Sequence, residues 1–189
     1  MDLHAAITKI YWLLLRLARV DKILWNRQYS RGRWQEDQRS PAVIELTTRL
    51  CRGGKLVEFG CGSGLLPLLL PVGTFSNYLG VDVSDVAIRL ANKRETVNCQ
   101  FRQQRMQDWK GDENVSLILA EECLYYLGPE EQRRFLKLCR DSLVPEGTIL
   151  VIVHDQNKHK ATLEVCRRTC HVRFEQARGK RAYLVLSKT

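Results

Sequence analysis

The residues at 57 to 64 read VEFGCGSG, and their types and spacing suit ligand binding. An apolar run that contains one acid, Glu58, gives way to glycine at positions 60, 62 and 64. Glycine adopts the left-handed backbone that a tight turn needs, and it lets a ligand approach the main chain. A glycine turn after an apolar run is typical of the first strand of a nucleotide-binding sheet, so it predicts a cofactor site.

Two phosphate-binding patterns do not fit this turn. A triphosphate loop has the pattern G-x-x-x-x-G-K-[ST], and neither that spacing nor the lysine is present. A dinucleotide turn has the pattern G-x-G-x-x-G, whereas position 65 is leucine. Glu58 would repel a pyrophosphate and attract an ammonium or a sulfonium. The residues therefore favour S-adenosylmethionine, which is cationic and carries no phosphate.

Asp82 is the second candidate ligand-binding residue. It lies near the end of the next apolar run, YLGVDVS, 18 residues after Gly64. A carboxylate at this position accepts hydrogen bonds from ribose hydroxyls in many nucleotide sites. The position predicts an unphosphorylated ribose, and an Asp that only caps the following helix is the alternative.

The elements that must position these residues are predicted strands that alternate with predicted helices. Helix-like stretches at 84–94 and 129–143 separate short apolar runs at 55–60, 78–83, 99–104, 115–120 and 148–153. Strands that alternate with helices predict right-handed crossovers and a mostly parallel sheet covered on both faces. HVRFEQAR and RAYLVLS are joined only by GK, which predicts a final β-hairpin and an antiparallel last strand.

Two helices are predicted before the first strand. Residues 3–24 place apolar side chains at amphipathic spacing, and a second helix runs from Ser40 or Pro41 to about Cys51. With 189 residues and 44% hydrophobic content, the chain suits one compact domain. We divide it into an N-terminal helix and lid segment, 1–39, and a core, 40–189.

Together these motifs resemble those of a class I S-adenosylmethionine-dependent methyltransferase. VEFGCGSG resembles the first motif of that family, GVDVSDVAI the second, LILAEECLYYL the fourth, and the terminal hairpin the sixth and seventh strands. The resemblance covers about residues 40–189. It implies a doubly wound, Rossmann-like α/β fold with a seven-stranded sheet, mostly parallel with an antiparallel last strand. It also implies S-adenosylmethionine as the cofactor.

The resemblance assigns cofactor contacts residue by residue. Gly60, Cys61 and Gly62 are expected to let the backbone approach the methionine moiety. Asp82 is expected to bind the ribose, with Val83 packed against the adenine.

The adenine end departs from the family pattern. The family usually has an acid and then a small residue or methionine after the third strand, and here that pair is Arg105 and Met106. Met106 and Gln107 are expected to contact the adenine. Arginine cannot accept a hydrogen bond, so Asp108, a backbone group or water must hold the adenine amino group.

The acceptor side is predicted at the carboxyl ends of the fourth and fifth strands. AEECLYY has no proline, which argues against methylation of exocyclic base nitrogens, and it resembles the motif of the bacterial small-molecule, nodulation-type branch. Glu121 is expected to face the methyl group, and Glu122 matches the glutamate of that branch. Glu121, Tyr125 and His154 are the candidate catalytic residues, since an imidazole suits proton abstraction. Their alternatives are a helix cap, a core aromatic and a surface histidine.

A lid is expected from the N-terminal segment. LWNRQYSRGRW resembles the W-x-x-x-Y-x-x-G-x-W stretch before the core in the same branch. Trp25, Tyr29 and Trp34 are therefore expected to close over the cofactor, where aromatic rings attract a sulfonium and exclude water. Anchoring of the first helix to the core is the alternative role.

Charge and composition bound the remaining function classes. The net charge of +9 is concentrated at the ends, since residues 155–189 hold nine Lys or Arg against three acids. Basic ends suit nucleic acid or a membrane surface, but they are also common as solvated charge. No run is long and apolar enough for a membrane span, and peripheral membrane contact by the N-terminal helix stays open. The cysteine and histidine spacing fits no metal site, and we expect a cytoplasmic protein with reduced thiols.

The sequence thus predicts a methyltransferase that moves a methyl group to an oxygen or nitrogen of a small-molecule acceptor. An RNA or other nucleic-acid methyltransferase is the alternative enzyme, less favoured because the proline motif is missing. An inactive, cofactor-binding subunit is the alternative without catalysis.

Overall fold

The computed structural model describes residues 20–32, 40–94 and 96–188. Its strands are β1 (Lys55–Phe59), β2 (Asn77–Asp82), β3 (Cys99–Gln103), β4 (Val115–Glu121), β5 (Leu143–Val153), β6 (His171–Arg178) and β7 (Arg181–Ser187). Its helices are α2 (Val20–Ser30), α3 (Pro41–Cys51), α4 (Leu66–Leu69), α5 (Asp85–Ala91), α6 (Pro129–Ser142) and α7 (Lys160–Thr169), with short 3-10 turns η1 (Met106–Asp108) and η2 (Leu124–Tyr126).

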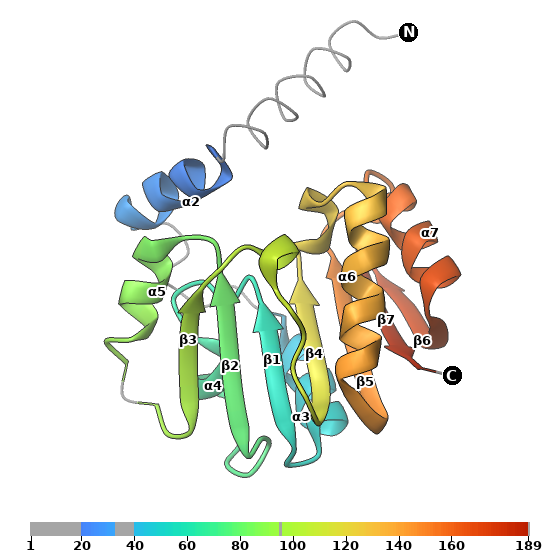
Figure 1. Cartoon of the computed structure of the whole chain (residues 1–189), viewed down its shortest axis with the longest axis horizontal. Helices are drawn as coiled ribbons and strands as arrows, with labels where there is room; N and C mark the ends of the chain where they lie inside the picture. The colour runs from blue at the N-terminus through green and yellow to red at the C-terminus, as the bar shows by residue number, and fades with distance from the viewer. Residues whose placement is uncertain (1–19, 33–39, 95, 189) are drawn as a thin grey trace, which may run out of the picture.

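The strands form one sheet in the order β3-β2-β1-β4-β5-β7-β6 (Figure 1). Strands β1 to β5 are parallel, and β7 runs antiparallel to both β5 and β6. The predicted doubly wound sheet with a final hairpin is confirmed. Because β7 is antiparallel, its first residue lies at the same edge of the sheet as the carboxyl ends of β1 to β5.

Two buried clusters cover the two faces of the sheet. One joins β1, β4 and β5 to Phe135 and Leu136 of α6 and to Leu163 of α7. The other joins the same strands to Val43 and Leu46 of α3 and to residues near α4. The central strands are buried on both faces, which explains why their sequences are continuous apolar runs without alternation.

The element boundaries differ from the predicted ones at two places. Strand β5 begins at Leu143, directly after α6, because Leu143 pairs with Val115 across a register shift in β4. The predicted helix over 3–24 falls mostly outside the described residues, and the described helix α2 continues to Ser30. Figure 1 shows α2 beside the N-terminal end of α5, above the arrowheads of β2 and β3.

Candidate functional site

The glycine turn follows β1 at the carboxyl edge of the sheet. Gly60, Gly62 and Gly64 have φ angles of +75°, +56° and +71°, a backbone region that favours glycine. The N–H groups of Gly60 and Cys61 both donate to the carbonyl of Val81, at 2.8 and 3.2 Å. The turn is therefore tied to the end of β2.

Asp82 is the last residue of β2, and its carboxylate faces the glycine turn. Its Oδ2 accepts a hydrogen bond from the N–H of Gly62 at 3.0 Å, and its Oδ1 accepts one from the N–H of Ser84 at 2.8 Å. Burial raises the pKa of Asp82 to about 6. The nearby charge of Glu58 acts in the same direction, whereas hydrogen bonds from backbone N–H groups, those of Ser84 and Gly62 first, act to lower it. A carboxyl group with an elevated pKa thus lies where the sequence predicts a ribose ligand.

Glu58 lies within β1 and is fully buried. It accepts a hydrogen bond from the hydroxyl of Tyr78 on β2. The Cys61 side chain is also buried, so its thiol is not available at the surface of the glycine turn. Because Glu58 is buried, we expect it to attract a bound cation through its charge rather than by direct contact.

The predicted adenine residues come from the ends of β2 and β3. Gln103 donates to the carbonyl of Val83 at 3.1 Å, which joins the two strand ends. Met106 and Gln107 are half-buried in η1, and Met106 packs against the core. Arg105 precedes η1 and is half-buried, whereas Asp108 is exposed.

Two of the three predicted lid aromatics lie on α2, and Trp34 lies outside the described residues. Tyr29 is 7% exposed, and its hydroxyl oxygen is 2.7 Å from the place that a Cβ on Gly62 would occupy. The ring of Trp25 meets the ring of Tyr126 edge to face at 5.7 Å. Helix α2 therefore reaches from the glycine turn to η2.

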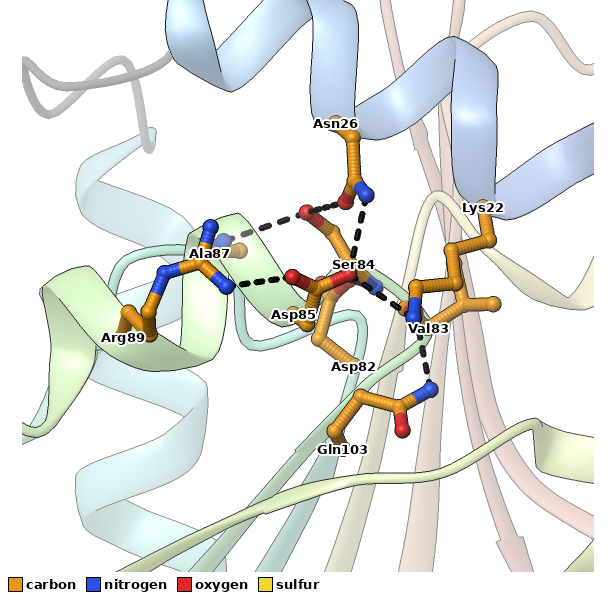
Figure 2. Close-up of polar contacts among 9 residues, drawn as sticks. All are labelled: Lys22, Asn26, Asp82, Val83, Ser84, Asp85, Ala87, Arg89 and Gln103. Atoms are coloured by element: carbon orange, nitrogen blue, oxygen red, sulfur yellow. Dashed lines mark hydrogen bonds and ion pairs between the residues drawn. The ribbon is translucent and has the colours of Figure 1, made fainter.

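Polar contacts also join α2 to the turn between β2 and α5 (Figure 2). The hydroxyl of Ser84 donates to Oδ1 of Asn26 at 2.7 Å, and Nδ2 of Asn26 donates to Asp85 at 2.9 Å. Lys22 forms an ion pair with Asp85 at 2.8 Å. The hydrogen bonds from Lys22 and Asn26 hold the pKa of Asp85 well below its usual range. No local sequence pattern predicted this network, because Asn26 and Ser84 are far apart in the chain.

Glu122, which follows β4, lies where the sequence predicts the acceptor side. Glu122 has a φ angle of +51°, an unusual backbone conformation for a residue with a side chain. Its Oε1 is 3.0 Å from Arg181 and 3.5 Å from Nδ1 of His154. Arg181 was not among the predicted site residues. The predicted antiparallel hairpin was the available signal, since it places the start of the last strand at this edge.

The other predicted catalytic residues lie close by. Glu121 is the last residue of β4 and is half-buried. The ring of Tyr125 stacks on the ring of His159, with centroids 3.9 Å apart and planes 14° apart. Burial raises the pKa of Tyr125, and burial together with Lys158 lowers the pKa of His159. The stack joins η2 to the residue that precedes α7.

Comparison with known proteins places this site in a family. Residues 56–147 match the family described as Methyltransferase domain. The chain therefore carries a methyltransferase domain over these residues, as the sequence predicts. The matched residues of this methyltransferase domain include the glycine turn, Asp82 and the end of β4. No curated protein matches the sequence.

Solved structures resemble the methyltransferase over most of its length. The N-methyltransferase NodS from Bradyrhizobium japonicum, solved with S-adenosylhomocysteine, has a TM-score of 0.64 and 17% identity over 82% of this chain and 91% of NodS. A TehB-like S-adenosylmethionine-dependent methyltransferase from Corynebacterium glutamicum has a TM-score of 0.67 and 16% identity over 92% and 99%. Magnesium protoporphyrin IX methyltransferase from Synechocystis, with bound S-adenosylmethionine, has a TM-score of 0.68 and 12% identity over 90% and 96%. At these identities the likeness concerns the fold.

The residues of the site fit S-adenosylmethionine, the cofactor of this methyltransferase family. A Cβ on Gly60 would lie only 3.2 Å from the Cβ of Cys123, so a side chain would crowd the surface that glycine leaves open. A carboxylate offers about four acceptor sites, so Asp82 can accept from the N–H groups of Gly62 and Ser84 and still accept from a ribose hydroxyl.

Two further features bear on the type of site. In the parts of the chain that the structure describes, no three His, Cys, Asp or Glu side chains come together as a metal site. Among the described helices, none is both long and apolar enough to cross a membrane.

Proposed function

We propose that this methyltransferase holds S-adenosylmethionine between the glycine turn and α2, and that it methylates an oxygen or nitrogen of a small-molecule acceptor. The observation that carries the cofactor part is Asp82, a buried carboxylate fixed by the N–H groups of Gly62 and Ser84. The glycine turn would receive the methionine moiety. Val83, Met106 and Gln107 would contact the adenine.

The bound cofactor supplies a methyl group that its sulfonium already activates. The residues of the chain must then orient the acceptor, exclude water and remove a proton where the acceptor loses one. Trp25 and Tyr29 on α2 would exclude water, because they lie over the carboxyl edge of the sheet.

Proton removal is assigned to Glu121 and His154. Glu121 ends β4 at the carboxyl edge, and His154 follows β5 beside Glu122. Arg181 neutralises Glu122, which leaves Glu121 as the acid of this pair that would approach an amine or hydroxyl. Tyr125, held against His159, would support one side of a flat acceptor.

Two observations support a small acceptor. Only α7 lies between β5 and β6, so the chain has no substrate domain inserted there. NodS, which shares this fold, is an N-methyltransferase. Nucleic-acid methylation is the second candidate, and the surplus of positive charge in residues 155–189 favours it.

Binding and turnover test the proposal separately. Isothermal titration of the full chain with S-adenosylhomocysteine should show one site, and Asp82→Ala should abolish binding while the protein still melts cooperatively. Incubation with labelled S-adenosylmethionine and a metabolite extract should transfer label to a small molecule. Label in RNA instead would support the second candidate, and cofactor binding without any transfer would indicate an inactive subunit.

A further inference from the structure

Helix α2 contacts both residues whose N–H groups hold the Asp82 carboxylate. The hydroxyl of Tyr29 lies over Gly62, and the amide of Asn26 is hydrogen-bonded to the side chain of Ser84. Asn26 and Tyr29 lie on one face of α2, since residues three apart in a helix are neighbours. One face of α2 thus covers both Gly62 and Ser84, whose N–H groups hold the carboxylate predicted to bind the ribose.

Asn26 makes two hydrogen bonds to the turn after Asp82, as Figure 2 shows. Its carbonyl oxygen accepts from the Ser84 hydroxyl at 2.7 Å, and its amino group donates to Asp85 at 2.9 Å. The Ser84 hydroxyl at the same time accepts from the N–H of Ala87 at 3.1 Å and caps α5. Because Asp85 can only accept and this hydroxyl must donate, the network defines the orientation of the Asn26 amide.

Asp85 is held in place by side chains from both helices. Lys22 and Asn26 approach it from α2, and Arg89 pairs with it from α5. The carboxylate also lies in the first turn of α5, where the helix dipole favours a negative charge. These contacts favour the ionised form of Asp85 and hold its pKa well below its usual range.

The cap of α5 does not itself need α2. The bonds from Ala87 N–H to the Ser84 hydroxyl and from Ser84 N–H to Asp82 lie within the core. What Asn26 adds is a connection between these bonds and the helix that covers the site.

We propose that Asn26 is a positioning residue for cofactor binding. It latches α2 onto Ser84 and Asp85, so that closure of α2 and the alignment of the Asp82 carboxylate are one coupled event. This inference rests on the proposed function, in which Asp82 binds the cofactor ribose.

Substitutions of Asn26 in the full chain test the latch, with S-adenosylhomocysteine as the probe in isothermal titration. Asn26→Ala removes both hydrogen bonds and favours the helical state, so a loss of helix propensity would not explain an effect. We expect its Kd to rise about tenfold, the usual scale for losing a hydrogen bond to a charged group. Arg27→Ala, on the exposed side of the same helix, is the control and should bind like the wild type.

Exchanging the amide and the carboxylate between positions 26 and 85 distinguishes a loss of the latch from a general loss of folding. Asn26→Asp alone sets two carboxylates against each other and should bind more weakly than Asn26→Ala. The pair Asn26→Asp and Asp85→Asn restores one carboxylate and one amide, and the carboxylate at position 26 lies four residues from Lys22, within ion-pair reach on a helix. We expect this pair to recover binding to within about threefold of the wild type.

Hydrogen exchange without any cofactor gives a second readout. In Asn26→Ala the amides of Gly62 and Ser84 should exchange faster than in the wild type, with the melting temperature nearly unchanged. Unchanged Kd and exchange in Asn26→Ala, equal weakening by Arg27→Ala, or no recovery in the exchanged pair would each overturn the latch. A wild-type chain that does not bind S-adenosylhomocysteine would overturn the proposed function and the latch with it, whereas wild-type binding with an unaffected Asn26→Ala would overturn the latch alone.

Discussion

Asp82 at the end of β2 and Glu58 within the neighbouring strand β1 are both buried acids, and their negative charges repel each other. Asp82 is 8% exposed and Glu58 is fully buried, so water screens neither carboxylate well. The N–H groups of Gly62 and Ser84 offset only part of the burial cost, which leaves the pKa of Asp82 at about 6. A bound cation would favour the ionised form, since opposite charges lower a carboxyl pKa.

We expect the affinity for S-adenosylhomocysteine to depend on pH through Asp82. The ribose hydroxyls donate to the ionised carboxylate, so affinity should rise about tenfold between about pH 5 and pH 7 and then level off, as expected for a pKa of about 6. Isothermal titration over this range measures the change. Asp82→Asn should bind weakly with a flat profile, and an equally steep profile in that variant would assign the titration to another group.

The same group should affect stability in the opposite direction. Its pKa is raised from 3.8 to about 6 on folding, so between these values the folded state binds more protons than the unfolded state. The contribution of Asp82 to the free energy of unfolding therefore falls as pH rises through this window, by an amount of the order of 2 to 3 kcal/mol. Urea unfolding of wild type and Asp82→Asn at about pH 4 and pH 7 tests the sign, and a wild-type contribution that grows with pH would contradict it.

Gly62→Ala should damage the site more than the fold. A Cβ there would lie 2.7 Å from the Tyr29 hydroxyl, and the φ angle of +56° already disfavours a side chain. Since Tyr29 would have to move, affinity for S-adenosylhomocysteine should fall. Gly179→Ala, with φ of +60° and open space around it, is the matched control. Both variants should lose about 1 kcal/mol of stability in urea, and equal ligand affinity in the two would argue against a clash with Tyr29.

At the scale of elements, α2 joins parts of the site that the core leaves separate. Trp25 contacts η2 on the proposed acceptor side, while Asn26 and Tyr29 contact the proposed cofactor side. The Trp25–Tyr126 ring pair, the buried Tyr29 and several polar contacts attach the helix, and none of its described residues belongs to the two core clusters. This kind of attachment suits an element that opens and closes.

Deleting residues 1–39 removes α2 and the rest of the predicted lid. Both sheet faces keep their buried clusters, so we expect the remaining core to unfold cooperatively. Affinity for S-adenosylhomocysteine should fall at least about tenfold, because the pre-organised contacts over the glycine turn are lost. Calorimetric unfolding and ligand titration measure the two effects. Unaltered affinity in a folded core would show that α2 is no lid.

At the scale of the molecule, charge separates the two candidate acceptors. The net charge of +9 includes nine Lys or Arg against three acids in residues 155–189. Part of this surplus is neutralised locally, since Arg167 and Arg168 on α7 pair with Glu164, and Arg167 also pairs with Glu175. Positive charge alone is therefore a weak indication of nucleic-acid binding.

We expect only non-specific binding to RNA. Fluorescence anisotropy with a single-stranded oligonucleotide at physiological salt should give a Kd of about 10⁻⁴ to 10⁻⁶ M that weakens further as salt is added. Labelled S-adenosylmethionine should leave this RNA unmethylated. Nanomolar binding together with methylation would favour the nucleic-acid candidate over the small-molecule acceptor.

The sequence by itself determined the features that depend on local pattern. Short apolar runs alternating with helix-like stretches predicted a mostly parallel sheet, and the spacing of the glycines at 60, 62 and 64 predicted the turn. Asp82 could be placed because strand ends in such a sheet meet at one edge. The two-residue GK connection predicted the final hairpin.

Only the tertiary structure decided which distant side chains act together. The contacts of Asn26 with Ser84, of Glu122 with Arg181 and of Tyr125 with His159 join separate segments of the chain. The raised pKa of Asp82 likewise depends on burial and on the charge of Glu58 across the strand ends. Hydrogen bonds, ring stacking and charge interactions act over a few ångströms in space, and local sequence patterns do not specify which remote residues reach that distance.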